Sequence, residues 1–272
     1  MNATVNYEVE YNNRARVPEH PALFAAWAKD AAAYRERHAP RSISYGAGAR
    51  NIIDFFPGGG EGPIVVFIHG GYWQSLDCSS FSHLAGGLNA HGISVAIPSY
   101  DLCPSVTVDD IIQQMRAASR ELARLGRSLV ISGHSAGGHL AACMLATDWP
   151  AFDTTLAEGL VVAAYAISGL FDLGPLVETS INYALRLDHA AARAASPLFW
   201  NAPLRGSLDA VVGENESAEY FRQSRTIVEL WGAAGFTARF GVVPGANHFT
   251  AIAPLADPES PMVLRLKELA GR

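Results

Sequence analysis

The fold of this chain is decided by the stretch Ser128-Leu129-Val130-Ile131-Ser132-Gly133-His134-Ser135-Ala136-Gly137. It begins as a short apolar run typical of a buried strand, and small residues follow it at helical spacing through Ala146. A serine between such a strand and such a helix lies on a strained turn with its hydroxyl exposed, the nucleophile elbow. We therefore interpret Ser135 as a nucleophile and expect the N–H of Ala136 to bind a developing oxyanion.

Similar apolar runs, rich in Val and Ile, alternate with helical patterns along the chain. Runs without polar alternation are typical of parallel strands covered on both faces. Strands are expected at 51–56, where the pattern alternates, and at 64–68, 94–97, 128–132, 160–167, 208–212 and 237–243, and helices at 21–38, 81–91, 108–125, 137–146, 219–234 and 258–269. This order predicts an α/β fold, in which helices cover both faces of a mainly parallel central sheet.

We expect one domain, 1–272, with two additions to the alternating pattern. The segment 21–38 predicts an amphipathic N-terminal helix with a proline in its first turn. The segment 174–203 is rich in alanine and interrupted by Pro197, and it predicts a short, cap-like helical insertion over one end of the sheet.

Composition excludes several classes of protein. With 49% hydrophobic residues, the 272-residue chain can bury a full core and is not disordered. Its 26 acidic and 20 basic residues provide no basic surface for a nucleic acid. No apolar run approaches the ~18 residues that span a bilayer, and the polar N-terminus does not resemble a signal peptide. We therefore expect a cytoplasmic protein without nucleic-acid or membrane partners. The sequence leaves the oligomeric state open, with a homodimer as one option.

The three cysteines, Cys78, Cys103 and Cys143, cannot all pair and lack the spacing of metal ligands. We expect them to be reduced and buried as small hydrophobic residues. Neither a metal nor another cofactor is expected.

A second motif, His69-Gly70-Gly71-Tyr72-Trp73, directly follows the apolar run 64–68. Two glycines at the end of a strand allow backbone N–H groups to converge on one small volume, so Gly70 and Gly71 are expected to complete an oxyanion hole with Ala136. His69 is expected to orient this loop through a hydrogen bond. Tyr72 and Trp73 either line a substrate pocket or pack beside it.

A serine nucleophile needs a base, and the base needs an acid that holds its imidazole in one tautomer. His248 lies in a Gly-containing loop after the last expected strand, where it can meet a serine on a neighbouring strand. The acid is expected at Glu216, in the loop after the strand 208–212, with Glu214 as its competitor. Asp172 is an outside candidate with a more plausible role in bracing the insertion.

These motifs together resemble the α/β-hydrolase superfamily over nearly the whole chain, and more closely the arylformamidase (kynurenine formamidase) group and its bacterial esterase relatives. The strings that carry the finer resemblance are Tyr11-Asn12-Asn13-Arg14-Ala15, His69-Gly70-Gly71-Tyr72-Trp73, Gly133-His134-Ser135-Ala136-Gly137-Gly138-His139-Leu140, Ser168-Gly169-Leu170-Phe171-Asp172-Leu173 and Ser217-Ala218-Glu219-Tyr220. The family's nucleophile falls on Ser135, its base on His248 and its acid on Glu216, where aspartate is more common.

The resemblance implies hydrolysis of a small-molecule acyl ester or amide. The substrate that it favours is an aryl formamide such as N-formylkynurenine. The expected aromatic pocket contains Tyr72, Trp73, Tyr100 and Phe249, closed by the segment 179–187. A short-acyl carboxylesterase is the alternative, and a non-catalytic binding protein of the same fold is a remote one.

Overall fold

The computed structural model describes residues 5–271, which form one eight-stranded sheet in the order β1-β2-β4-β3-β5-β6-β7-β8. The strands are β1 (Arg41–Ser44), β2 (Ile52–Phe56), β3 (Ile64–Ile68), β4 (Val95–Pro98), β5 (Leu129–His134), β6 (Val161–Ile167), β7 (Leu208–Gly213) and β8 (Ala238–Val243). Neighbours from β4 to β8 pair in parallel, whereas β2 pairs antiparallel with both β1 and β4. The predicted α/β fold with a mainly parallel sheet is therefore confirmed.

The edges of the sheet differ from the sequence expectation. β1 was not expected, because Arg41–Ser44 is a short, largely exposed segment without an apolar pattern. β8 was expected to be covered on both faces, but it is the last strand of the sheet and its side chains are exposed or half-buried. An edge strand has a neighbour on one side only, and its apolar residues alone do not reveal this.

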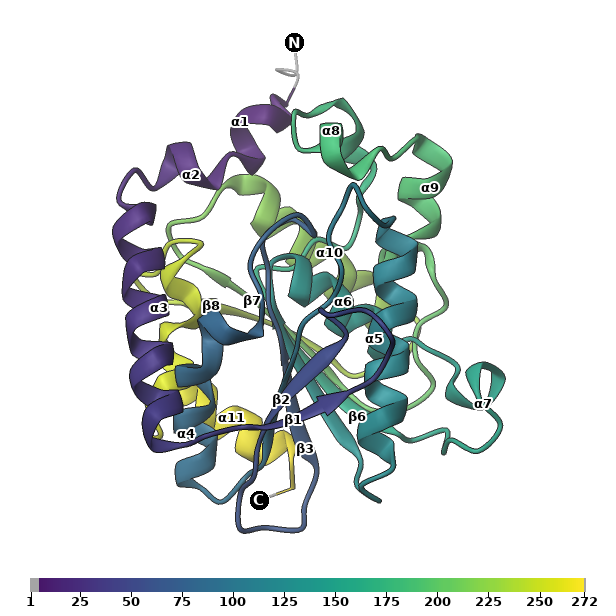
Figure 1. The fold of residues 1–272 in the computed structure, drawn as a ribbon. Coiled ribbons are helices and arrows are strands. Elements are labelled where there is room, and N and C mark those ends of the chain that lie inside the picture. Colours follow the sequence, from purple (N-terminus) through teal and green to yellow (C-terminus); the bar gives the residue numbers. More distant parts are fainter. Residues whose placement is uncertain (1–4, 272) are drawn as a thin grey trace.

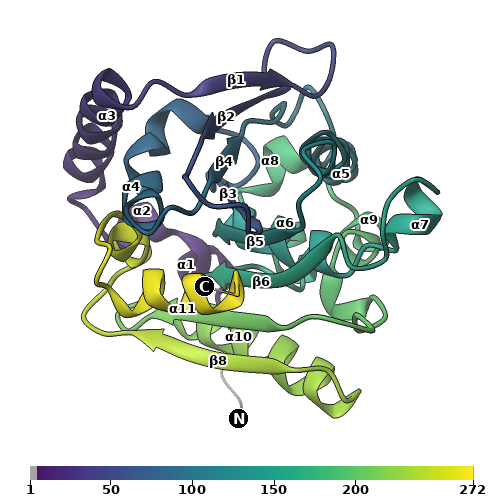
Figure 2. The ribbon, with the colours of Figure 1, turned by 90° about the horizontal axis from the view of Figure 1, so that it is seen from below.

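Helices cover both faces of the sheet (Figures 1 and 2). The α-helices are α1 (Tyr7–Tyr11), α2 (Asn13–Arg16), α3 (His20–Arg37), α4 (Ala85–Ala90), α5 (Val108–Ala123), α6 (Ala136–Leu145), α7 (Trp149–Phe152), α8 (Asn182–Leu185), α9 (His189–Ala194), α10 (Ala218–Ala233) and α11 (Pro261–Leu269). Residues of α5, α6 and α10 pack into one buried cluster, and residues of α3, α4 and α11 into the other. Short 3-10 helices occur at Cys78–Leu84, Gly174–Glu178, Pro197–Phe199 and Thr250–Ala256.

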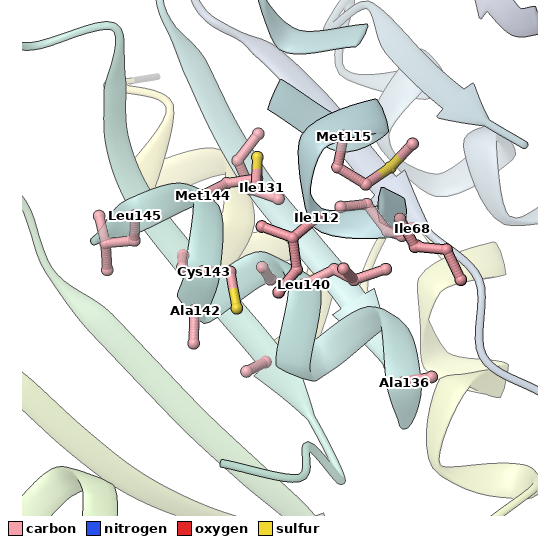
Figure 3. Packing of buried hydrophobic residues seen from close by; sticks show 14 of the residues in the cluster. Ile68, Ile112, Met115, Ile131, Ala136, Leu140, Ala142, Cys143, Met144 and Leu145 are labelled. Carbon is pink, nitrogen blue, oxygen red and sulfur yellow. The ribbon is translucent and has the colours of Figure 1, made fainter. Parts of the chain in front are cut away.

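Helix α6 follows the predicted nucleophile, and every one of its residues is buried. Its side chains, among them Leu140 and Met144, pack against Ile112 and Met115 of α5 and against strand residues such as Ile131 (Figure 3). Burying a leucine or methionine side chain contributes about 1.5–3 kcal/mol. This packing holds the N-terminus of α6 firmly against the sheet.

The segment between β6 and β7 forms the expected helical insertion, which includes α8 and α9. Together with α1 and α2 it lies across the top of the molecule in Figure 1. Glu8 of α1 joins the two parts, because its carboxylate accepts hydrogen bonds from the Ser180 N–H (2.7 Å) and hydroxyl (2.6 Å). Helices α1 and α2 thus cover part of this end of the sheet.

The three cysteines are buried and carry free thiols, as expected. Burial raises the pKa of Cys78 to about 12 and that of Cys103 to about 11, so both are neutral thiols at neutral pH. Within residues 5–271, no helix has the length and apolar character needed to cross a membrane.

Candidate active site

Ser135 joins β5 to α6 with a backbone that an L-residue rarely adopts, φ +58° and ψ −118°. Such a conformation persists only where the surroundings enforce it. Here the Ser135 N–H donates to the Ile167 carbonyl of β6 (2.8 Å), and the buried residues of α6 hold the other side of the turn. The residue is therefore presented on a strained turn at the C-terminal end of β5.

Two glycines allow the backbone to approach this turn closely. A Cβ on Gly137 would lie 1.9 Å from the Ile68 carbonyl oxygen, so α6 can start against the end of β3 only with glycine there. A Cβ on Gly70 would lie 2.8 Å from the His134 carbonyl oxygen and 3.0 Å from the Ser135 Cβ. The backbone of Gly70 therefore passes directly beside Ser135, where the oxyanion hole was predicted.

The structure brings Glu216 and His248 together from the loops that follow β7 and β8. His248 Nδ1 lies 2.6 Å from Glu216 Oε2. The other oxygen, Oε1, accepts hydrogen bonds from the Gly213 N–H (2.7 Å) and the Ser168 hydroxyl (2.5 Å). Since an ionised carboxylate can only accept, Nδ1 of His248 donates to it and Nε2 keeps a free lone pair.

The other acid candidates lie elsewhere. Glu214 accepts a hydrogen bond from the Gly245 N–H (2.7 Å), which ties together the loops after β7 and β8. Asp172 accepts from the Gly174 N–H (3.0 Å) at the start of the insertion, in agreement with its expected bracing role. Glu216 alone of these three acids touches His248.

His134 contacts both the backbone and the ring of the predicted base, His248. Its Nε2 lies 2.8 Å from the His248 carbonyl oxygen, and the two imidazole rings are 4.7 Å apart. Burial, together with the nearby His248, holds the pKa of His134 well below its usual range. The neutral ring therefore donates its Nε2 proton to that carbonyl, which anchors the loop that carries His248.

Ser135 and His248 face one cavity of about 460 Å³, within the usual size range of small-molecule sites. Tyr72 and Phe249 line it as expected, and Phe24 and Trp27 of α3 add further aromatic surface. No hydrogen bond of normal geometry joins the Ser135 hydroxyl to the His248 ring, although both residues are described. Among residues 5–271 no group of three or more His, Cys, Asp or Glu is placed to hold a metal ion.

The sequence pattern of the Alpha/beta hydrolase family matches residues 65–268, about three quarters of the chain. The chain belongs to the alpha/beta hydrolase family.

Its relatives within the family are hydrolases. It is 30% identical to the kynurenine formamidase of Danio rerio over 219 residues (77% of this chain, 73% of that protein). It is 31% identical to that of Drosophila melanogaster over 235 residues (80% and 77%). The solved structure of a candidate thioesterase from a Silicibacter species is 35% identical, with a TM-score of 0.86 over 96% of this chain and 98% of that one. The chain is thus a hydrolase that resembles arylformamidases and esterases.

Two expected pocket residues of this hydrolase lie outside the cavity. Trp73 is fully buried and packs edge-on against His139, with ring centroids 5.0 Å apart. Tyr100 is also fully buried; it stacks on His69 (4.3 Å) and donates its hydroxyl proton to the His69 carbonyl (2.9 Å). Both residues support the glycine loop from behind, so their assignment to the substrate pocket is wrong.

His69 has the structural role expected for it. Its Nδ1 lies 2.8 Å from the Gly70 carbonyl oxygen, and burial lowers its pKa to about 4, so the ring is neutral.

Two residues of this site were not predicted from the sequence. Tyr220, on the first turn of α10, places its ring 4.6 Å from that of His248. Asn13 of α2 donates its side-chain amide to the Tyr220 hydroxyl (2.8 Å). Both belong to strings that carry the family resemblance, which was the only available signal, but no pattern in the sequence assigns a role to either residue.

Proposed function

We propose that this chain is a serine hydrolase that releases formate from an aryl formamide such as N-formylkynurenine. The observation that carries the proposal is the Glu216–His248 pair (2.6 Å), because His248 lines the same cavity as the serine on the strained turn. The kynurenine formamidases at about 30% identity support the substrate class.

In the first half of the reaction, His248 Nε2 takes the proton of the Ser135 hydroxyl, whose oxygen attacks the formyl carbon. The N–H groups of Gly70, Gly71 and Ala136 bind the oxyanion of the tetrahedral intermediate. The C–N bond then breaks, and His248 returns its proton to the leaving aryl amine. The formyl group remains on Ser135 as an ester.

In the second half, a water molecule gives a proton to His248 and attacks the formyl ester. Collapse of this second intermediate returns the proton to Ser135 and releases formate. Glu216 stabilises the imidazolium that forms in each half-reaction.

The walls of the cavity suit an aromatic leaving group. Phe249 lies against Phe24 (5.1 Å between ring centroids) and Trp27 (6.2 Å), and the three rings offer flat apolar surface. The same cavity is also lined by Arg14 and Glu8, a basic and an acidic residue. Groups of both charges fit a substrate whose aryl ring carries an amino-acid tail.

The proposal is tested by measuring formate release from N-formylkynurenine by the wild type and by Ser135→Ala. The variant should lose about 10⁵-fold or more in kcat, because the nucleophile is gone, while its melting temperature stays nearly unchanged. Retained turnover would refute the serine mechanism. If the wild type hydrolyses short-chain aryl esters but no aryl formamide, the enzyme is instead a carboxylesterase.

A further inference from the structure

The cavity that contains Ser135 differs in character between its buried and its exposed lining. Its buried lining includes the predicted nucleophile and base and two aromatic residues, Trp27 and Phe249. Its acidic and basic residues, Glu8 and Arg14, are exposed. The reacting groups and the aromatic surface therefore lie at the inner end of the cavity, and both charges lie where it opens to solvent.

Arg14 is a cation without a partner in the part of the chain that the structure describes. Its side chain makes no hydrogen bond or ion pair with any of residues 5–271. Arg16, two residues further along the same helix, α2, instead pairs with Glu10 (3.3 Å) and does not line the cavity. A guanidinium offers a planar fork of N–H donors that matches a carboxylate. A carboxylate that enters the cavity can thus bind Arg14 without breaking an existing contact.

Glu8 adds a fixed negative charge to the same lining. Its carboxylate accepts the Ser180 N–H (2.7 Å) and hydroxyl (2.6 Å), and Ser180 also lines the cavity. These hydrogen bonds lower the pKa of Glu8, so the group is ionised at neutral pH. Each of its oxygens has a second lone pair for a bound cation. A purely anionic ligand is attracted by Arg14 but repelled by Glu8, whereas a zwitterion suits both residues.

We propose that Arg14 and Glu8 bind the α-carboxylate and the α-ammonium group of an amino-acid tail on the substrate. The enzyme then selects amino-acid substrates over plain aryl formamides. This inference rests on the proposed formamidase function. With the formamide at Ser135 and the tail at the cavity opening, the aryl ring lies between them, beside Trp27 and Phe249. Arg14 and Glu8 take no part in proton transfer; they determine specificity by holding the tail.

The first test compares N-formylkynurenine with its α-carboxamide, which has the same formamide, ring and ammonium group but no negative charge. At about pH 6.5 the α-amino group is charged in both compounds. The wild type should show a kcat/KM about five to ten times higher for the acid, as expected for one solvent-exposed bidentate ion pair. This preference should shrink at about 1 M salt, which screens exposed charges.

Arg14→Gln should lose both the preference for the acid and its salt dependence, mainly through KM. Arg16→Gln is the matched control, because it removes an equally exposed arginine from the same helix without changing the cavity lining. It should keep both properties of the wild type. Since Arg14 is exposed and without a partner, its replacement should leave the fold intact.

Glu8→Gln tests the opposite charge with the analogue of N-formylkynurenine that lacks the α-amino group. The glutamine oxygen can still accept the Ser180 N–H, so the position of the side chain is kept. The wild type should prefer N-formylkynurenine to this analogue by a similar factor of about five to ten, and Glu8→Gln should not.

Two outcomes separate this inference from the formamidase function. A wild type that hydrolyses formanilide, N-formylkynurenine and its carboxamide equally well, or an Arg14→Gln enzyme that keeps the preference for the acid, would overturn the tail site alone. A wild type that hydrolyses no aryl formamide would overturn the formamidase function. The tail site is then judged by inhibition of nitrophenyl acetate hydrolysis: kynurenine should inhibit the wild type more strongly than kynurenine carboxamide does, and equal inhibition would overturn it.

Discussion

Replacing Glu216 with glutamine is expected to lower kcat by about 10⁴-fold while preserving the shape of the site. The change swaps one carboxylate oxygen for an NH₂ group of nearly the same size. Its effect is determined by the three donors around the carboxylate: Gly213, Ser168 and His248.

The surroundings force the new amide into one orientation. The Gly213 N–H, 2.7 Å from Oε1, can only donate, so an oxygen must remain on that side. The NH₂ group then faces His248 Nδ1, at the 2.6 Å contact. The imidazole must turn into the tautomer that accepts at Nδ1 and carries its proton on Nε2. In this tautomer Nε2 cannot take the proton from Ser135.

The magnitude follows from the loss of the base. A fall of 10⁴ corresponds to about 5.5 kcal/mol, the scale found when a triad acid is replaced by its amide in serine hydrolases. The opposite orientation of the amide would set two N–H groups against each other and leave buried donors unpaired, at about 1–3 kcal/mol each. The orientation that disables His248 is therefore the more stable one.

The assay is kcat for formate release from an aryl formamide, with Glu214→Gln as the matched control. Glu214 binds the Gly245 N–H and does not touch His248, so this variant should keep wild-type kcat. The imidazole ¹⁵N shifts of His248 should report a change of tautomer in Glu216→Gln alone. A Glu216→Gln enzyme that is folded and keeps more than about a tenth of wild-type kcat would refute this reasoning.

Two further predictions concern stability. Burial lowers the pKa of His69 and of His139 from 6.5 to about 4. Between pH 7 and pH 5 each of these histidines becomes protonated in the unfolded chain but stays neutral in the folded chain. The free energy of unfolding should therefore fall by about 2 kcal/mol for each histidine. Urea unfolding at several pH values should show a smaller fall for His139→Gln than for the wild type. If the stability of both proteins falls equally with pH, the lowered pKa of His139 is contradicted. Gly137→Ala should destabilise the chain by about 3 kcal/mol, because the new Cβ would meet the Ile68 carbonyl at 1.9 Å. Gly59→Ala, with nothing within 4 Å, is its control, and equal melting temperatures for the two would show that α6 can shift.

Local patterns in the sequence were enough to predict most of the fold. The apolar run before Ser135 and the small residues after it predicted β5 and α6 to within two residues, because burial and helix formation depend on neighbours along the chain. The same reasoning failed for β1, whose four residues owe their conformation to pairing with β2 and show no apolar pattern.

The pocket was harder to predict because it depends on the direction of individual side chains. Tyr72 and Trp73 are adjacent in sequence and both have positive φ, yet Tyr72 lines the cavity and Trp73 packs behind it. Tyr100 likewise follows a strand at the correct end of the sheet but stacks on His69. Spacing alone could not separate an aromatic residue that faces the cavity from one that supports its wall.

The sequence by itself determined seven of the eight strands and most of the longer helices, the turn that carries Ser135 and the glycines beside it, since these are set by interactions within a few residues. Only the tertiary structure decided that Glu216 rather than Glu214 meets His248, and that the ring of Tyr220 packs on His248. Asn13 and Tyr220 are separated by 207 residues, and Tyr72 and Tyr220 by 148. Residues so far apart in the sequence meet only when the sheet has brought its loops together.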